Sequence, residues 1–343
     1  MDKNLNNSVY KQLAQRLDTI PNGFPATESG VELKLLAKLF TPEEAAIALQ
    51  LKLIPEYAEE VAKRTGADPQ AMEATLKGMA GKGLIRMKRG QKAPVFGLMP
   101  FVVGIYEMQI TRMDKELAQI FEDYYKEAFH KMLHSGPSIH RVIPVEQAVQ
   151  TGLEVLPYER ASEILSHAQS WGALDCICRV QKKLLGQACE HPVNVCLMFS
   201  RKPNAYEKAQ HIRSLTKEEA LELLRQAEEA GLVHTTGNHL GDQDYICNCC
   251  ACACAILRGA AEYGILSVLE PSAFRASPSR SSRGRRSRRA ISSRNAPVPA
   301  AHFRFILKLT RRPSLSNFMI LLSCPPMSTT VMGPGKKWRQ PRP

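Results

Sequence analysis

Five cysteines within eight residues are the feature that most constrains this chain. They lie between Cys247 and Cys254, in the stretch ICNCCACAC that begins at Ile246. A packed core would mix cysteine, which behaves as a small hydrophobe, with larger apolar side chains. Thiols at this density instead indicate that the chain holds something soft, most simply an iron–sulfur cluster or zinc.

A second set of cysteines lies about 50 residues upstream, with the spacing C-x-C-x10-C-x6-C: Cys176, Cys178, Cys189 and Cys196. Four thiolates are the usual complement of a [4Fe–4S] cluster or a structural zinc. We favour the cluster, because zinc sites more often use two cysteines separated by two to four residues. Arg179, Lys182 and Lys183 follow the first pair closely, and positive charge there would stabilise an anionic cluster.

Local conformation decides which thiols of the second set act together. In an extended chain Cys250, Cys252 and Cys254 point to one face. In a helix Cys247, Cys250 and Cys254 do so instead, and Cys249 or an upstream residue supplies the remaining ligand. We expect all nine cysteines of both sets to line cofactor sites. The predicted direct metal ligands are Cys176, Cys178, Cys189, Cys196, Cys247, Cys250 and Cys254.

His191 lies two residues after Cys189. We favour a satisfied or solvent-facing histidine, and the alternative is a fourth metal ligand or an imidazole hydrogen-bonded to a cluster sulfide. The sequence shows no phosphate-binding Walker A loop, no dinucleotide fingerprint and no nucleophile elbow. We therefore predict no catalytic residues.

The net charge of +13 is carried by the C-terminal tail. From Ser277 to Pro343 the sequence has 12 Arg, 3 Lys and no Asp or Glu, which leaves 31 basic against 33 acidic residues in the body, 1–276. The body therefore has no overall basic field. We interpret the tail as out-of-frame or unselected sequence, because apolar pieces such as FRFILKL fit a disordered arm poorly. The alternative is a basic arm that binds nucleic acid or an acidic partner.

The N-terminal stretch MDKNLNNSVYKQL has no apolar core typical of a signal peptide, and no run of 18 apolar residues follows. We therefore predict a cytoplasmic protein without a membrane span. In that compartment clustered cysteines are more often metal ligands than disulfides.

Helical patterns fill most of the first hundred residues, and Thr41 with Glu44 predicts a capping box. Helices over 55–65 and 68–83 precede a basic turn around Gly90 that predicts a hairpin. This order is typical of a winged helix. DNA binding would use the wing cations Arg86, Lys88, Arg89 and Lys92. We favour a packing or dimerisation role, because 68–83 offers two lysines, Lys77 and Lys82, and no cluster of base-reading side chains.

The remaining pattern predicts one long helix over 103–134, which could form a homodimer. Further helices are expected near 159–170, over 217–230 with a capping box from Thr216 and Glu219, and over 255–264. The expected fold is mainly α with small β elements (α+β). Its parts are a winged-helix-like domain over 1–102, a long helix and connector over 103–157, a cysteine-rich domain over 158–275 and a tail of low order over 276–343.

Three stretches resemble a known family: CICRVQKKLLGQACEHPVNVCLMF, KEEALELLRQAEEAGLVHTTGN and ICNCCACACAILRG. They are similar to bacterial and archaeal iron–sulfur proteins of the 4Fe-4S ferredoxin type, and the resemblance covers about residues 1–275. It implies one or two [4Fe–4S] clusters and a redox partner protein. Two departures stand out. Ala253 replaces an expected cysteine, and the C-terminal two-cluster ferredoxin module is missing, with a single Cys324 in its place.

We therefore expect an iron–sulfur electron-transfer protein or an oxidoreductase component. The alternatives are a redox- or metal-responsive winged-helix DNA-binding regulator and a zinc-stabilised interaction module.

Overall fold

A computed structural model of the chain describes residues 9–134, 137–143, 161–207, 209, 211–238 and 243–270. The predicted tail over 276–343 lies outside the described residues, as does most of the connector before residue 157. None of the helices in the described ranges is long and apolar enough to cross a membrane.

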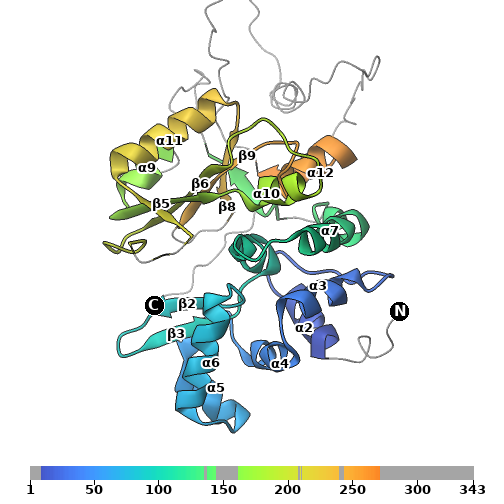
Figure 1. The fold of residues 1–343 in the computed structure, drawn as a ribbon, viewed down its shortest axis with the longest axis vertical. Helices are drawn as coiled ribbons and strands as arrows, with labels where there is room; N and C mark the ends of the chain where they lie inside the picture. Colours follow the sequence, from blue (N-terminus) through green and yellow to red (C-terminus); the bar gives the residue numbers. More distant parts are fainter. Residues whose placement is uncertain are drawn as a thin grey trace, which may run out of the picture. The chain divides into compact units, whose positions relative to one another are not determined.

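The described residues 9–81 form five helices, drawn blue to cyan in Figure 1. They are α2 (Val9–Asp18), α3 (Val31–Leu39), α4 (Pro42–Gln50), α5 (Ala58–Thr65) and α6 (Pro69–Gly81). The predicted capping box is confirmed. The Thr41 hydroxyl accepts from the Glu44 amide at 3.2 Å, and the Thr41 amide donates to the Glu44 carboxylate at 3.0 Å. Gly66, at a φ of 71°, ends α5 in the left-handed conformation that glycine adopts readily.

The predicted hairpin is also present. Strands β2 (Arg86–Arg89) and β3 (Pro94–Gly97) pair antiparallel, and β1 (Glu56–Tyr57) adds to β3, so the strand order is β1-β3-β2. Phe96 of β3 is fully buried. Lys88, Arg89 and Lys92 are exposed. The hairpin therefore anchors its apolar side on the helices and presents its cations to solvent.

The prediction of a single long helix over 103–134 is wrong for the residues before Lys115. Continuous helix begins at Lys115 with α7 (Lys115–Tyr124) and runs through the π-helical turn η3 (Tyr125–Phe129) into α8 (His130–Met132). The Asp114 carboxylate accepts from the Leu117 amide at 2.7 Å and so caps the helix there. Residues before it form two short turns, η1 (Phe101–Ile105) and η2 (Glu107–Gln109), in which Phe101, Val102 and Ile105 are buried and Met108 is exposed.

The cysteine-rich region is built on a seven-stranded sheet with the order β10-β4-β8-β9-β6-β5-β7. All pairs are antiparallel except β10 with β4. Its strands are β4 (His140–Val142), β5 (Ser170–Asp175), β6 (Asn194–Ser200), β7 (Arg213–Leu215), β8 (Val233–Gly237), β9 (Tyr245–Cys249) and β10 (Leu269–Glu270). The fold is mixed α+β, as predicted, with more sheet than the sequence suggested.

Four helices accompany this sheet: α9 (Ala161–Ser166), α10 (Ile177–Leu184), α11 (Lys217–Glu229) and α12 (Ala255–Tyr263), the last followed by the 3-10 turn η5 (Leu266–Val268). The helix predicted near 159–170 ends at Ser166, and Ser170 already begins β5. The predicted capping box at Thr216 and Glu219 is present, with both hydrogen bonds formed.

The alternation of side chains along β6 and β9 places the cysteines. Val195, Leu197 and Phe199 of β6 share a core with the apolar face of α11, which lies beside β5 and β6 with α9 in Figure 1. Because successive residues of a strand point to opposite faces, Cys196 of β6 lies on the other side of the sheet. Cys249 of β9 and Cys254 belong to the other core, which continues into the N-terminal helices.

Candidate metal centre

The nine cysteines between 176 and 254 are all free thiols, and the structure sorts them into two groups that cut across the two sequence sets. We call the first the inner ring: Cys176, Cys178, Cys196, Cys247, Cys249 and Cys254. We call the second the outer group: Cys189, His191, Cys250 and Cys252. Cys189 thus lies with the downstream cysteines and not with the three upstream cysteines predicted to share its site.

Strand ends and helix starts position the inner ring. Cys176 follows β5 and is the N-cap of α10, whose first turn holds Cys178. Cys254 is the N-cap of α12. Cys196 comes from β6, and Cys247 and Cys249 occupy alternate positions on β9. Two helices therefore begin at the ring and direct the positive ends of their dipoles toward it.

Thiol–thiol interactions close these six side chains into a ring in which each thiol has two neighbours. Cys176 interacts with Cys178 and Cys196, Cys254 interacts with Cys178 and Cys249, and Cys247 interacts with Cys196 and Cys249. The neighbouring thiols, chiefly Cys247, lower the pKa of Cys249 to about 6. Neighbouring thiols, chiefly Cys178, also lower the pKa of Cys176 well below its usual range. The same interactions raise the pKa of Cys178 and Cys247. The ring therefore has two acidic thiols at separate positions.

One buried cation lies between the two groups. Arg179 is 3% exposed, and its Nη2 donates to the Asn248 carbonyl at 2.9 Å. Its Nε and Nη1 are buried and have no hydrogen-bond partner among the described residues. Burial alone would lower the pKa of Arg179, but the thiolates of Cys176 and Cys250 outweigh it and the pKa is raised. The guanidinium is therefore held by negative charge on sulfur.

The outer group brings four ligand atoms within 4.8 Å of one another. Cys189 and His191 lie in the connection from α10 to β6, and Cys250 and Cys252 lie in the turn between β9 and α12. The Sγ atoms of Cys189 and Cys250 are 4.0 Å apart, and those of Cys250 and Cys252 are 3.2 Å apart. His191 Nδ1 is 3.6 Å from the Cys252 Sγ. This group could hold a metal ion.

The structure changes two sequence predictions about residues near the thiol groups. The structure brings His191 into the outer group, which favours the ligand alternative over the structural histidine, and the C-x-H spacing after Cys189 was the available signal. Lys182 does not contribute charge at the ring as predicted, because its Nζ binds Glu122 at 3.1 Å and Gln187 at 2.8 Å. Arg179 is the predicted cation that does face thiols.

A buried polar chain beside the ring was not predicted from the sequence. The Tyr245 hydroxyl lies 3.1 Å from His140 Nε2, and His140 Nδ1 lies 3.2 Å from the Thr235 hydroxyl. That hydroxyl lies 3.6 Å from the Cys249 Sγ. Burial lowers the pKa of His140 to about 4, so the imidazole is neutral. The chain fixes the side chains around Cys249 without adding charge.

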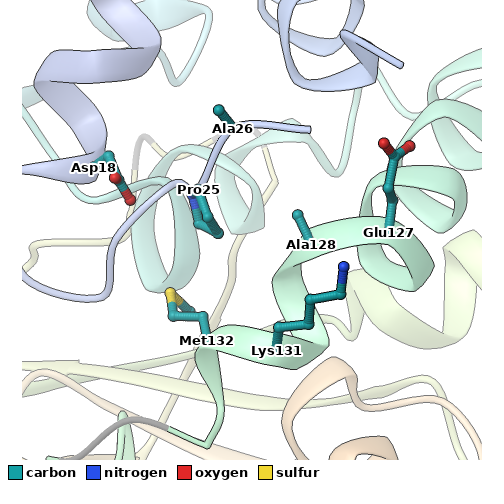
Figure 2. Close-up of a pocket in the computed structure, with 7 residues that line it drawn as sticks. All are labelled: Asp18, Pro25, Ala26, Glu127, Ala128, Lys131 and Met132. Carbon is teal, nitrogen blue, oxygen red and sulfur yellow. The ribbon is translucent and has the colours of Figure 1, made fainter. Parts of the chain in front are cut away.

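A pocket of about 270 Å³ lies elsewhere, lined by Asp18, Pro25, Ala26, Glu127, Ala128, Lys131 and Met132. Figure 2 shows these side chains at the end of α2, on the loop after it and on the helix from η3 to α8. No cysteine or histidine is among them, so this pocket is separate from both thiol groups.

Comparison with known proteins gives no relatives: no family model, no curated protein and no solved structure matches this chain. Membership of the ferredoxin-type iron–sulfur family therefore stays a prediction. Function is inferred from the thiols and their surroundings alone.

Proposed function

We propose that the inner ring binds an iron–sulfur cluster, a [4Fe–4S] cluster by preference, and that the protein transfers electrons through it. The observation that carries this proposal is a closed ring of six thiols at two helix N-termini, beside a buried arginine that has two N–H-bearing atoms without a described partner. A buried guanidinium without partners is costly unless an anion compensates it. An anionic cluster held by thiolates would be such an anion.

The size of the ring supports a cluster over a single ion. Zn–S bonds of about 2.3 Å in a tetrahedral site place two sulfurs about 3.8 Å apart. Among the described residues, the four ligand atoms of the outer group lie within 4.8 Å of one another. The ring instead joins six thiols, two more than the four ligands that one tetrahedral ion takes. Its six thiols exceed the four that a [4Fe–4S] cluster requires, which leaves two to donate S–H hydrogen bonds.

The chain's own groups would tune the site. A bound cluster supplies one-electron redox chemistry. Arg179 and the N-termini of α10 and α12 stabilise negative charge in the ring and so favour the reduced state. The packing of Tyr106 and Ile177 around the ring excludes water, since both are buried. No side chain is assigned a catalytic role, and we propose an electron carrier or an oxidoreductase component that meets a redox partner protein.

The DNA-binding regulator is the weaker candidate. The order from α4 through β1, α5 and α6 to the exposed β2–β3 hairpin is that of a winged helix, which favours it. However, the two cations near the second helix of the pair are already neutralised. Lys77 Nζ lies 2.7 Å from the Glu73 carboxylate, and Lys82 Nζ lies 2.7 Å from that of Glu44. A helix with paired lysines is poorly equipped to read bases.

Iron and acid-labile sulfide analysis of anaerobically purified protein tests the proposal. We expect a brown protein with about equal iron and sulfide, and we expect Cys178→Ser to lose most of both. Cys324→Ser is the matched control, because Cys324 is the one cysteine outside residues 176–254. A colourless wild-type protein without iron, or a Cys178→Ser variant with undiminished iron, would refute the proposal.

A further inference from the structure

We propose that the outer group is a second, separate metal site that holds one tetrahedral ion, best matched by Zn²⁺. The ligands are Cys189, Cys250 and Cys252 through sulfur and His191 through Nδ1. This site does not rest on the proposed function of the inner ring, because its ligands and its spacing are its own.

The distances within the group fit one ion. In a tetrahedral zinc site with Zn–S of about 2.3 Å and Zn–N of about 2.0–2.1 Å, sulfurs lie about 3.8 Å apart and nitrogen lies about 3.6 Å from sulfur. The sulfur pairs that involve Cys250 measure 4.0 and 3.2 Å, on either side of that value. The distance from His191 Nδ1 to the Cys252 Sγ is 3.6 Å. A four-iron cluster would hold its cysteines farther apart, since each ligates a different iron.

The ligand chemistry also favours zinc. Three thiolates with one imidazole form one of the usual structural zinc sets. The spacing within each pair is C-x-H or C-x-C, which is shorter than the usual zinc knuckle. The fold compensates, because the two pairs come from two different connections. Each connection therefore supplies two of the four corners.

Most of the described ring thiols pack in one core and Cys189 and Cys250 in the other, and the ring member Cys178 contacts both cores. Cys250 is 2% exposed and is buried in the core that α9 and α11 form with the sheet. Its sequence neighbour Cys249 is buried in the other core. Cys252 is exposed and offers an entry path from solvent. An ion can thus reach the outer group without passing through the inner ring.

The consequence for the fold is a clamp between two connections. A bound ion would tie the loop that carries Cys189 and His191 to the turn that carries Cys250 and Cys252. That turn joins β9 to α12, and therefore lies between the ring members Cys249 and Cys254.

Metal analysis of single variants tests this site. Zinc, iron and sulfide are measured per chain in protein produced with both metals and purified anaerobically. We expect about one zinc in the wild type, and we expect His191→Ala and Cys252→Ser to lose that zinc and keep most of their iron. His211→Ala is the matched control, because His211 is exposed and outside the group. Cys178→Ser should lose iron and keep zinc.

A second measurement covers the case in which the Cys178→Ser variant does not keep the folded inner ring. Co²⁺ added to metal-free wild type and to metal-free His191→Ala reports directly on the outer ligands. The wild type should develop the intense sulfur-to-cobalt and d–d absorption of tetrahedral thiolate-bound Co²⁺, and His191→Ala should lose or shift it. The proposal is overturned if His191→Ala binds Co²⁺ as the wild type does. It is also overturned if His191→Ala and Cys252→Ser lose iron in proportion to zinc, because the outer residues would then belong to the cluster.

Discussion

Two buried arginines of the cysteine-rich region each lie near the start of a helix that follows a ring cysteine. Their side chains have different kinds of partner. Arg179 lies one turn into α10, which begins after Cys176, and Arg258 lies one turn into α12, which begins after Cys254. Arg258 is fully paired: it donates to both oxygens of Glu122 at 2.9 and 2.8 Å and to Glu262 at 2.7 Å. It also lies 4.0 Å above the Tyr125 ring. Arg179 has no carboxylate partner: it donates to the Asn248 carbonyl and interacts with the Cys250 sulfur.

The difference shows which charges the chain compensates by itself. A buried guanidinium needs a counter-charge, and a bidentate carboxylate is the strongest that a protein supplies. The chain supplies Glu122 for Arg258. For Arg179 it supplies thiolates, whose charge depends on what they bind. We infer that Arg258 stabilises the fold under all conditions, whereas Arg179 stabilises it only when the ring carries negative charge.

The largest expected effect is that of removing Glu122. Glu122→Ala leaves Arg258 and Lys182 buried without their carboxylate, and we expect a loss of about 3–5 kcal/mol in the free energy of unfolding. Urea denaturation of the metal-loaded and the metal-free protein measures it. The loss should be similar in both, because no thiol participates. A loss below about 1 kcal/mol would contradict the view that Glu122 is the counter-charge that stabilises buried Arg258.

The pH dependence of the same carboxylate gives the next largest effect. Burial by itself raises the pKa of Glu122, but the hydrogen bonds and charge of Arg258, with Gln181 and Lys182, outweigh it and hold the pKa at about 2. Since the folded-state pKa is depressed, the stabilisation is complete above the unfolded value of 4.5 and is lost as the pH falls toward about 2. The shift corresponds to about 3 kcal/mol.

Unfolding free energies of wild type and Glu122→Gln over that range provide the measurement. The difference between the two should shrink steadily below pH 4.5. The matched control is Glu163→Gln in α9, outside the network of Glu122 and Arg258, which should change the unfolding free energy by no more than about 0.5 kcal/mol. A constant difference between wild type and Glu122→Gln down to the lowest pH would contradict the depressed pKa.

Arg179 gives a smaller effect whose sign should depend on metal. Arg179→Met removes a buried charge with unpaired N–H groups, and we expect it to stabilise the metal-free protein by about 1–3 kcal/mol. In the iron-loaded protein the same change removes the cation beside the ring, so iron should be released faster and the reduction potential should fall. Parallel unfolding of both forms checks the reversal. Destabilisation of the metal-free protein would show that Arg179 already has sufficient partners.

Local patterns predicted local structure well. The two capping boxes, at Thr41 and Thr216, involve residues three apart, so their geometry depends on neighbours in sequence. The same holds for Gly66 as the end of α5. The long helix predicted before Lys115 failed because Phe101 and Tyr106 are buried by contacts distant in sequence, with Phe24 and Phe121, which override a helical pattern.

The composition of the thiol groups could not be predicted, because it depends on which strands pair. β6 pairs with β9, so Cys196 meets Cys247, while the loop between α10 and β6 brings Cys189 to Cys250. A sheet register is a long-range property that spacing along the chain does not encode. Cysteine type and number therefore indicated metal binding, but not which thiols share a site. Arg179 was predicted as a nearby charge, but its unpaired N–H groups emerge only from the packing.

The smallest expected effect concerns Lys182, which binds the Glu122 carboxylate beside Arg258. Burial, with the charge of Arg258, lowers the pKa of Lys182, so the fold already disfavours this charge. Lys182→Met leaves Glu122 bound by both nitrogens of Arg258, and it frees the exposed Gln187 to meet water. We therefore expect a change within about 1 kcal/mol in either direction, against about 3–5 kcal/mol for Arg258→Met at the same carboxylate. Urea denaturation of Lys182→Met and Arg258→Met measures the two changes in the free energy of unfolding. Equal losses would mean that both cations share the Glu122 carboxylate equally. Glu122, Arg258 and Lys182 would then form one three-charge network, in place of a single arginine paired by one carboxylate.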